Sequence, residues 1–294
     1  MDAPSAGVHT EILLLEVYPY ASVYLGDEGM MGGEAADRIA GFWRALGATP
    51  PPEPDHLASV CGLFASLLDA EGVDEPSGAA VDARLSSAAG EHPASRARRA
   101  FLWEHMVPWI PVFSAKVEDV SQRSGPEAEP LRQWAALLLE ALEDEVRRDG
   151  ADERDTPRGV LPLHLREAAD GLVIGAPGDR ESFGVEDLAV QMVVPVRTGI
   201  VVARSDLAAA ASAMGVGVRA GDRRFMLKSL LEQEASGTLA WLAGEAERWR
   251  TRHAELVPLL GDTAEFWARR AAASSVLLAD AARTAAEVTG ASGG

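Results

Sequence analysis

The chain carries, at Phe101–Phe113, the stretch FLWEHMVPWIPVF. Pro108 and Pro111 oppose a regular helix here, because proline lacks a backbone N–H and its ring clashes with the preceding turn. Spacings of three and four residues within the stretch predict one helical face, formed by Phe101, Leu102, His105, Met106 and Trp109. A helix ending in a kinked aromatic corner fits the wall of a groove. The alternative interpretation is that these residues are hydrophobic core.

The composition is that of a globular protein with an acidic surface. Hydrophobic residues make up 47% of the 294 positions, and 45 acidic against 27 basic residues give a formal net charge of -18. Such a surface repels nucleic acid and anionic lipid and attracts basic peptides. The chain contains a single cysteine, Cys61. An intramolecular disulfide is therefore excluded, and the helical pattern around Cys61 predicts a small buried side chain rather than a nucleophile.

Neither a secretory signal nor a membrane span is expected. The first apolar run, Ile12–Leu15, is short, and no basic region precedes it. A span needs about 20 consecutive apolar residues, which the sequence does not provide. We therefore predict a cytoplasmic protein.

Helical periodicity dominates the chain and predicts an all-α fold, a single globular bundle of roughly ten helices. Glycine, proline and charged residues at Asp149–Pro157 read as an exposed loop. This loop is the best candidate boundary, between a helical core at 1–150 and a C-terminal helical extension at 151–294. The helices are expected at or near 34–46, 53–68, 76–87, 94–107, 131–147, 162–169, 206–214, 222–236, 238–260 and 263–288.

The secondary structure of one segment is ambiguous from the sequence. Val190–Val202 is rich in β-branched residues and is broken by Pro195 and Gly199, so it fits either a helix or an extended strand. Ser205 is expected to cap the helix that follows it, and Gly215 to end that helix.

The sequence shows no catalytic constellation. The six histidines are scattered without metal-ligand spacing, and no phosphate-binding loop or nucleophile elbow is present. Gly215, Gly217 and Gly221 miss the dinucleotide spacing and join two helices. We predict a protein that is not an enzyme and that carries no cofactor and no metal.

Asp55 and His56 allow two interpretations. As an acid in a helical first turn, Asp55 complements the helix dipole, and His56 is then an ordinary surface imidazole. Alternatively, Asp55 accepts an arginine of a ligand while His56 offers a hydrogen bond beside an aromatic groove.

Three blocks, taken in order, resemble the TorD/DmsD/NarJ family of redox-enzyme maturation chaperones. Pro19–Leu25 is similar to the family's proline–x–x–Ser–Val–aromatic–Leu segment, and Pro52–Leu57 contains its Pro-Asp-His-Leu hallmark. Phe101–Phe113 matches its His–hydrophobic–x–Pro–Trp–x–Pro–x–Phe corner. The chain departs from the family at Val60, where many members carry glutamate. The likeness covers roughly residues 10–150.

This resemblance implies an all-α, non-enzymatic, cytoplasmic chaperone, either monomer or homodimer. Its partner would be the apo catalytic subunit of a molybdopterin oxidoreductase or the subunit's twin-arginine signal peptide. The resemblance favours the binding interpretation of Asp55 and His56, which we place at the mouth of the groove. The peptide-binding residues that it implies are Tyr20, Ser22, Tyr24, Leu25, Asp55, His56, Leu57, Trp103, His105 and Trp109. The competing hypothesis is a helical scaffold or regulatory adaptor whose aromatic corner is only core.

Overall fold

The computed structural model describes residues 4–72, 93–149, 160–168, 170–174 and 184–292. Within these residues the chain forms helices and no strand, with one isolated antiparallel bridge between Tyr20 and His56. The all-α prediction is confirmed. The described residues form fourteen α-helices rather than roughly ten, because several are single short turns. The helix expected at Pro76–Ser87 lies outside the described residues.

The first half of the chain folds as one run of packed helices. Its elements are α1 Ala6–His9, the π-helix η1 Thr10–Glu16, α2 Ala21–Leu25, α3 Gly33–Ala45, α4 Leu57–Gly72, α5 Pro93–Phe101, the π-helix η3 Leu102–Met106, α6 Ile110–Ser124, the 3₁₀ turn η4 Pro126–Ala128 and α7 Glu129–Asp149.

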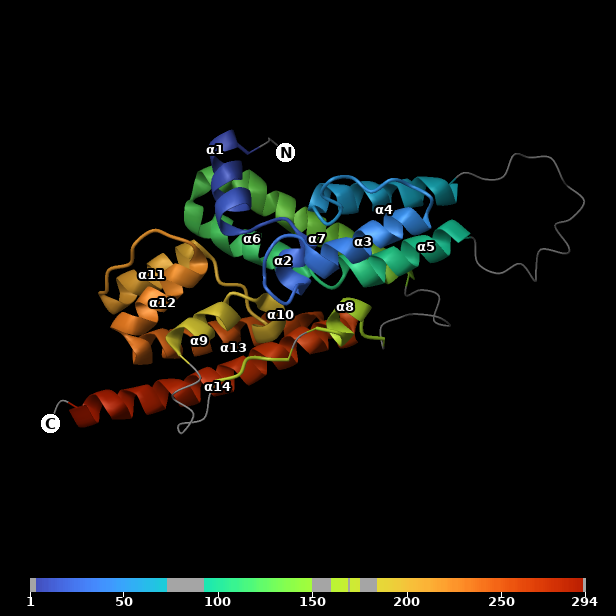
Figure 1. The fold of residues 1–294 in the computed structure, drawn as a ribbon. Coiled ribbons are helices and arrows are strands. Elements are labelled where there is room, and N and C mark those ends of the chain that lie inside the picture. Colours follow the sequence, from blue (N-terminus) through green and yellow to red (C-terminus); the bar gives the residue numbers. More distant parts are fainter. Residues whose placement is uncertain (1–3, 73–92, 150–159, 169, 175–183, 293–294) are drawn as a thin grey trace, which may run out of the picture.

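The second half contributes both short and long helices. Its elements are α8 Leu163–Arg166, α9 Val185–Met192, α10 Pro195–Thr198, α11 Arg204–Met214, α12 Arg223–Gln233, α13 Ala235–Leu260 and α14 Asp262–Ser292. In Figure 1, α13 and α14 lie side by side along one side of the molecule, opposite α3 and α4. Short α2 and α10 contact each other where the halves meet.

The proline-rich corner interrupts the helix, as predicted: η3 ends at Met106, and a turn over residues 107–109 separates it from α6. The amide of Val107 donates to the carbonyl of Leu102 at 2.9 Å, a wide π-turn that ends the helix just before Pro108. Helix α6 then begins at Ile110 with Pro111 in its first turn, where the missing N–H costs nothing. The corner therefore joins two helices.

The ambiguous segment Val190–Val202 is partly helical. It holds the end of α9, then α10, followed by irregular backbone. Gly199 closes α10 with a positive φ of 73°, and a Cβ there would lie 2.3 Å from the amide nitrogen of Ala271 in α14. Only glycine permits the backbone at residue 199 to lie this close to α14, so the end of α10 packs directly against that helix.

Two predicted helix ends need correction. Ser205 lies inside α11 rather than at its cap, because Asp206 accepts the amide of Ala203 at 2.6 Å and so satisfies the helix start instead. The helix expected from Asp222 to about residue 236 breaks at Glu234, where α12 ends and α13 begins. Gly215 ends α11 in the left-handed conformation, as predicted.

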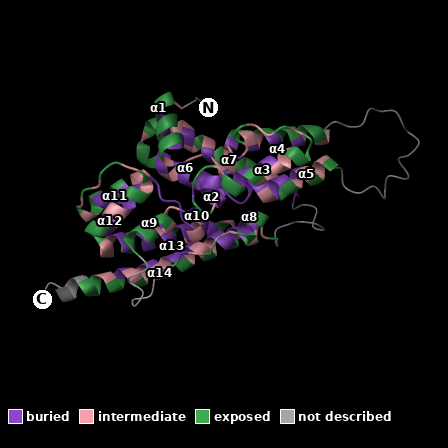
Figure 2. Cartoon of the chain, in the orientation of Figure 1, coloured by how far each residue is buried: buried purple, intermediate pink, exposed green. Residues whose placement is uncertain are grey.

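Buried side chains form one hydrophobic cluster that runs from Val8 to Ala282 and draws on both halves of the chain (Figure 2). Trp109, Phe101 and Phe113 of the corner are among its largest fully buried members. The division near residue 150 stays a prediction, since the proposed boundary loop lies largely outside the described residues.

Candidate functional site: a methionine loop beside the signature blocks

The first two signature blocks, Pro19–Leu25 and Pro52–Leu57, are joined through their backbones. The amide of Ala21 donates to the carbonyl of Asp55 at 3.0 Å, and the amide of Leu57 donates to the carbonyl of Pro19 at 2.8 Å. Two segments that are distant in sequence therefore form one short antiparallel pairing that fixes the start of α2.

The carboxylate of Asp55 points inward and caps α2. Its Oδ2 accepts the hydroxyl of Ser22 at 2.5 Å and the amide of Ser22 at 3.2 Å, and Asp55 is only 3% exposed. The hydroxyl oxygen of Ser22 in turn accepts the amide of Gly32 at 3.0 Å. Asp55 thus lies outside α4, where a first-turn acid was predicted, and a direct contact between Asp55 and a ligand stays a prediction.

His56 and Tyr20 lie at the surface side of the same pairing. Their rings meet edge-on at 4.9 Å between centroids, and both side chains are half-buried. The Nδ1 atom of His56 accepts the amide of Ala58 at 3.1 Å, so the imidazole satisfies an amide in the first turn of α4. Leu57, by contrast, is buried.

The side chains predicted to line an aromatic groove are buried in this structure, and their role in peptide binding stays a prediction. Trp109 is fully buried and stacks on Tyr24 at 5.6 Å between ring centroids, while its Nε1 donates to the carbonyl of His105 at 2.8 Å. Trp103 is also buried, and its Nε1 donates to Asp149 at 2.8 Å. Large aromatic surfaces are removed from water here, which favours a role in stability.

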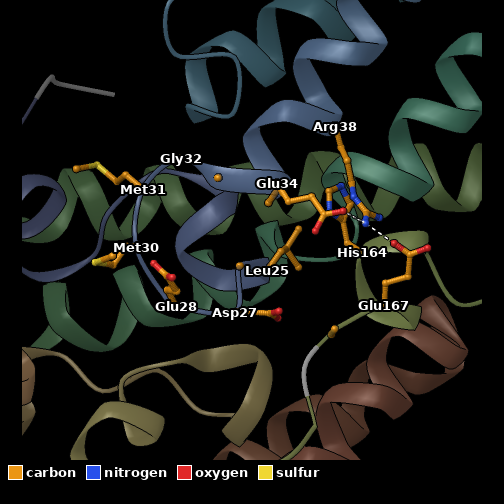
Figure 3. Close-up of a pocket in the computed structure, with 14 residues that line it drawn as sticks. Leu25, Asp27, Glu28, Met30, Met31, Gly32, Glu34, Arg38, His164 and Glu167 are labelled. Atoms are coloured by element: carbon orange, nitrogen blue, oxygen red, sulfur yellow. Dashed lines mark hydrogen bonds and ion pairs between the residues drawn. The ribbon is translucent and has the colours of Figure 1, made fainter.

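A pocket of about 250 Å³ opens directly after α2, and we call it the Met-loop pocket (Figure 3). Leu25 is the one predicted site residue in its lining. The lining residues are Leu25, Gly26, Asp27, Glu28, Met30, Met31, Gly32, Gly33, Glu34, Ala35, Arg38, His164, Glu167 and Ala168.

Acidic side chains dominate the charge of this pocket. Four carboxylates line it against one guanidinium, that of Arg38. Arg38 lies at one end, where it binds Glu34 at 2.6 Å and also pairs with Glu167, as Figure 3 shows. Glu167 and His164 come from the region around α8, so the second half of the chain closes this end.

The opposite end of the pocket is apolar and exposed. Met30 and Met31 are 62% and 60% exposed, and Figure 3 shows them projecting from the loop away from Arg38. Methionine is flexible and polarizable, which suits surfaces that adapt to varied apolar partners. These methionines belong to the glycine-rich segment Gly26–Gly33, which we call the methionine loop.

Behind the pocket, His105 and His164 form a buried pair. Their Nδ1 and Nε2 atoms lie 3.2 Å apart. Burial, followed by the nearby His164, lowers the pKa of His105 to about 3. Burial, followed by the charge of Arg38, lowers the pKa of His164 to about 4. Both imidazoles are therefore neutral at pH 7.

Acid should destabilise the fold through this pair. Because both pKa values lie below the ordinary 6.5, the unfolded chain binds more protons than the folded chain below that pH. The contribution is complete above pH 6.5 and is lost as the pH falls toward the folded-state pKa values, about 4 for His164 and about 3 for His105. We expect about 1–2 kcal/mol of lost unfolding free energy per histidine between pH 7 and pH 5.

Urea denaturation of His105→Gln/His164→Gln at both pH values checks this expectation. The double variant should lose less stability on acidification than the wild type does. Replacing the exposed His9 by glutamine should leave the difference between the two pH values unchanged. An equal loss in the double variant and the wild type would contradict the assignment.

The part of the chain that the structure describes contains no group of three or more His, Cys, Asp or Glu side chains placed to hold a metal ion. Over the same residues, no helix is both long and apolar enough to cross a membrane.

Comparison with known proteins returns one family. Residues 13–115 match the family model described as nitrate reductase delta subunit, a span that holds all three signature blocks and most of the Met-loop pocket. No curated protein and no solved structure matches the chain. Over residues 13–115 the chain is therefore similar to the nitrate reductase delta subunit family, a family of molybdoenzyme maturation chaperones.

Proposed function

We propose that the protein is a cytoplasmic chaperone, without catalytic activity, that binds the apo catalytic subunit of a molybdopterin oxidoreductase before cofactor insertion. The observation that carries this proposal is the Met-loop pocket, which places acidic side chains beside two exposed methionines within the family segment. A partner with a basic group next to an apolar stretch complements both features.

A twin-arginine signal peptide has this chemistry. Its guanidinium groups would meet the carboxylates of Glu28 and Glu34, because guanidinium–carboxylate hydrogen bonds are charge-assisted and often bidentate. Its apolar stretch would lie on Met30 and Met31. Arg38 already binds Glu34 from within the chain, so an incoming arginine shares or replaces that contact.

The chaperone works as a monomer or homodimer in this proposal. Exposed charges are screened over about 8 Å at physiological ionic strength, so binding should weaken as salt rises. The long-range attraction of a chain with a net charge of -18 for a basic peptide acts in the same direction.

The test is a pull-down from native extract, read by mass spectrometry, with wild type and Glu28→Gln/Glu34→Gln/Glu167→Gln. We expect the wild type to retain a molybdopterin oxidoreductase subunit and the variant to lose it. The matched control removes the same charge at exposed positions elsewhere, in Glu140→Gln/Glu232→Gln/Glu255→Gln, and should retain the subunit.

Retention by both variants would place the site elsewhere, and absence of the subunit from the wild-type sample would overturn the chaperone proposal. The burial of Asp55, Trp103 and Trp109 favours a second candidate, a helical scaffold or adaptor in which the signature residues only support the fold. In that case the wild type would retain partners of another class, and the Met-loop variant would retain them equally.

A further inference from the structure

A second, larger pocket lies on the other side of the methionine loop, and we call it the arginine pocket. Its volume is about 630 Å³, and it brings α11 and the start of α12 against the first half of the chain. The lining residues are Tyr18, Val23, Gly29, Met30, Met31, Arg204, Ala220, Gly221, Asp222 and Arg223. Met30 and Met31 line both pockets, so the two are neighbours.

The two arginines of this pocket lack a carboxylate partner among the described residues. Arg204 makes no ion pair there, and its Nε is buried without a hydrogen bond. Arg223 donates to the carbonyl of Val202 at 3.3 Å and lies over the ring of Tyr18 at 5.8 Å, but it pairs with no acid.

Two nearby acids, Glu16 and Asp222, attract the charge of Arg223, but among the described residues neither forms an ion pair with it. Oε2 of Glu16 accepts the amide of Ser205 at 2.9 Å. Oδ1 of Asp222 accepts the amide of Phe225 at 2.8 Å and caps α12. Two guanidinium groups therefore line this pocket without an ion pair among the described residues, beside the apolar side chains of Met30 and Met31.

We propose that the arginine pocket binds an apolar peptide segment that carries carboxylate side chains. Charge complementarity selects the acid, and the exposed Met30 and Met31 provide apolar contact. The open, methionine-walled shape fits an extended segment of a partner protein. This proposal shares Met30 and Met31 with the Met-loop pocket but rests on different charged residues, the arginines Arg204 and Arg223.

The probe is an eight-residue peptide of leucine, alanine and two glutamates, labelled with a neutral fluorophore and compared with its glutamine counterpart. Fluorescence anisotropy is measured at about 0.15 M salt. At this ionic strength the repulsion from acids more than about 8 Å away is screened, whereas direct contacts in the pocket persist. We expect the glutamate peptide to bind wild type about tenfold more tightly than the glutamine peptide.

Arg204→Gln should remove this preference, with the fold checked by circular dichroism. The matched control is Arg224→Gln, on the same helix as Arg223 but 3.5 Å from Glu186, and it should keep the preference. Equal binding of the two peptides to wild type, or an unchanged preference in Arg204→Gln, would overturn the proposal. Displacement of the glutamate peptide by equimolar pyrophosphate would also overturn it, because the ligand would then be a free anion.

These outcomes are separable from those of the proposed function. A basic peptide reports on the Met-loop pocket through Glu28→Gln/Glu34→Gln/Glu167→Gln, whereas the glutamate peptide reports on Arg204. Loss of one interaction with retention of the other identifies which assignment failed.

Discussion

Trp109→Ala should lower the free energy of unfolding by about 3–5 kcal/mol. Trp109 is fully buried, and it packs on Tyr24 and on Phe113, whose ring centroid is 5.8 Å away. Alanine leaves a cavity between α2 and α6 that the surrounding helices cannot fill, and the carbonyl of His105 loses its donor. Urea denaturation followed by circular dichroism measures the loss.

Trp109→Phe separates packing from hydrogen bonding at the same position. It keeps an aromatic ring in the stack but removes the indole N–H, so we expect a loss of about 1–2 kcal/mol. One other outcome for Trp109→Ala would support the aromatic groove that the sequence predicts. If Trp109→Ala kept wild-type stability and lost client binding, Trp109 would be a ligand contact after all.

Local patterns predicted much of the fold because helix periodicity is a short-range property. The two long closing helices were expected at 238–260 and 263–288, and the structure has Ala235–Leu260 and Asp262–Ser292. Errors arose where a distant residue supplies a cap. Asp55 accepts a hydrogen bond from Ser22, 33 positions away, instead of capping the helix that follows it in sequence. No local sequence pattern predicts that contact.

The candidate site was harder to predict, for the same reason. The three blocks resemble a known family by residue type, but aromatic residues of the same type can line a groove or fill a core. Burial distinguishes the two, and it depends on packing between α2, α5 and α6. The exposed methionines belong to a loop with no helical or strand pattern, and His164 comes from beyond the matched family segment.

The signature blocks nevertheless lead to the pocket. The carboxylate of Asp55 accepts a hydrogen bond from the hydroxyl of Ser22. The hydroxyl oxygen of Ser22 accepts one from the amide of Gly32, near the end of the methionine loop. Two consecutive hydrogen bonds, one buried and one partly buried, thus connect the Pro-Asp-His-Leu block to the loop that presents Met30 and Met31. We interpret the polar signature residues as positioning groups for a surface that the family motif itself does not contain.

A second large effect is expected where the two halves of the chain meet. Asp206→Ala should lower the free energy of unfolding by about 3–5 kcal/mol, because it leaves a buried charge without its partner. Lys116 in α6 is 1% exposed and pairs with Asp206 in α11, which also binds Arg123 at 2.5 Å. Burial lowers the pKa of Lys116, and Asp206 opposes that shift. Urea denaturation at pH 7 gives the loss.

The double variant Lys116→Met/Asp206→Ala makes this prediction specific. Removing the buried ammonium together with its partner leaves no unpaired charge, so the double variant should be more stable than Asp206→Ala alone. Lys116→Met alone should cost less than Asp206→Ala, because Asp206 keeps Arg123 and the amide of Ala203. If the losses of unfolding free energy in the two single variants added up to the loss in the double variant, Lys116 would be solvated when it is unpaired. Recovery in the double variant would instead mean that one buried ion pair couples the family segment's last helix to the C-terminal half.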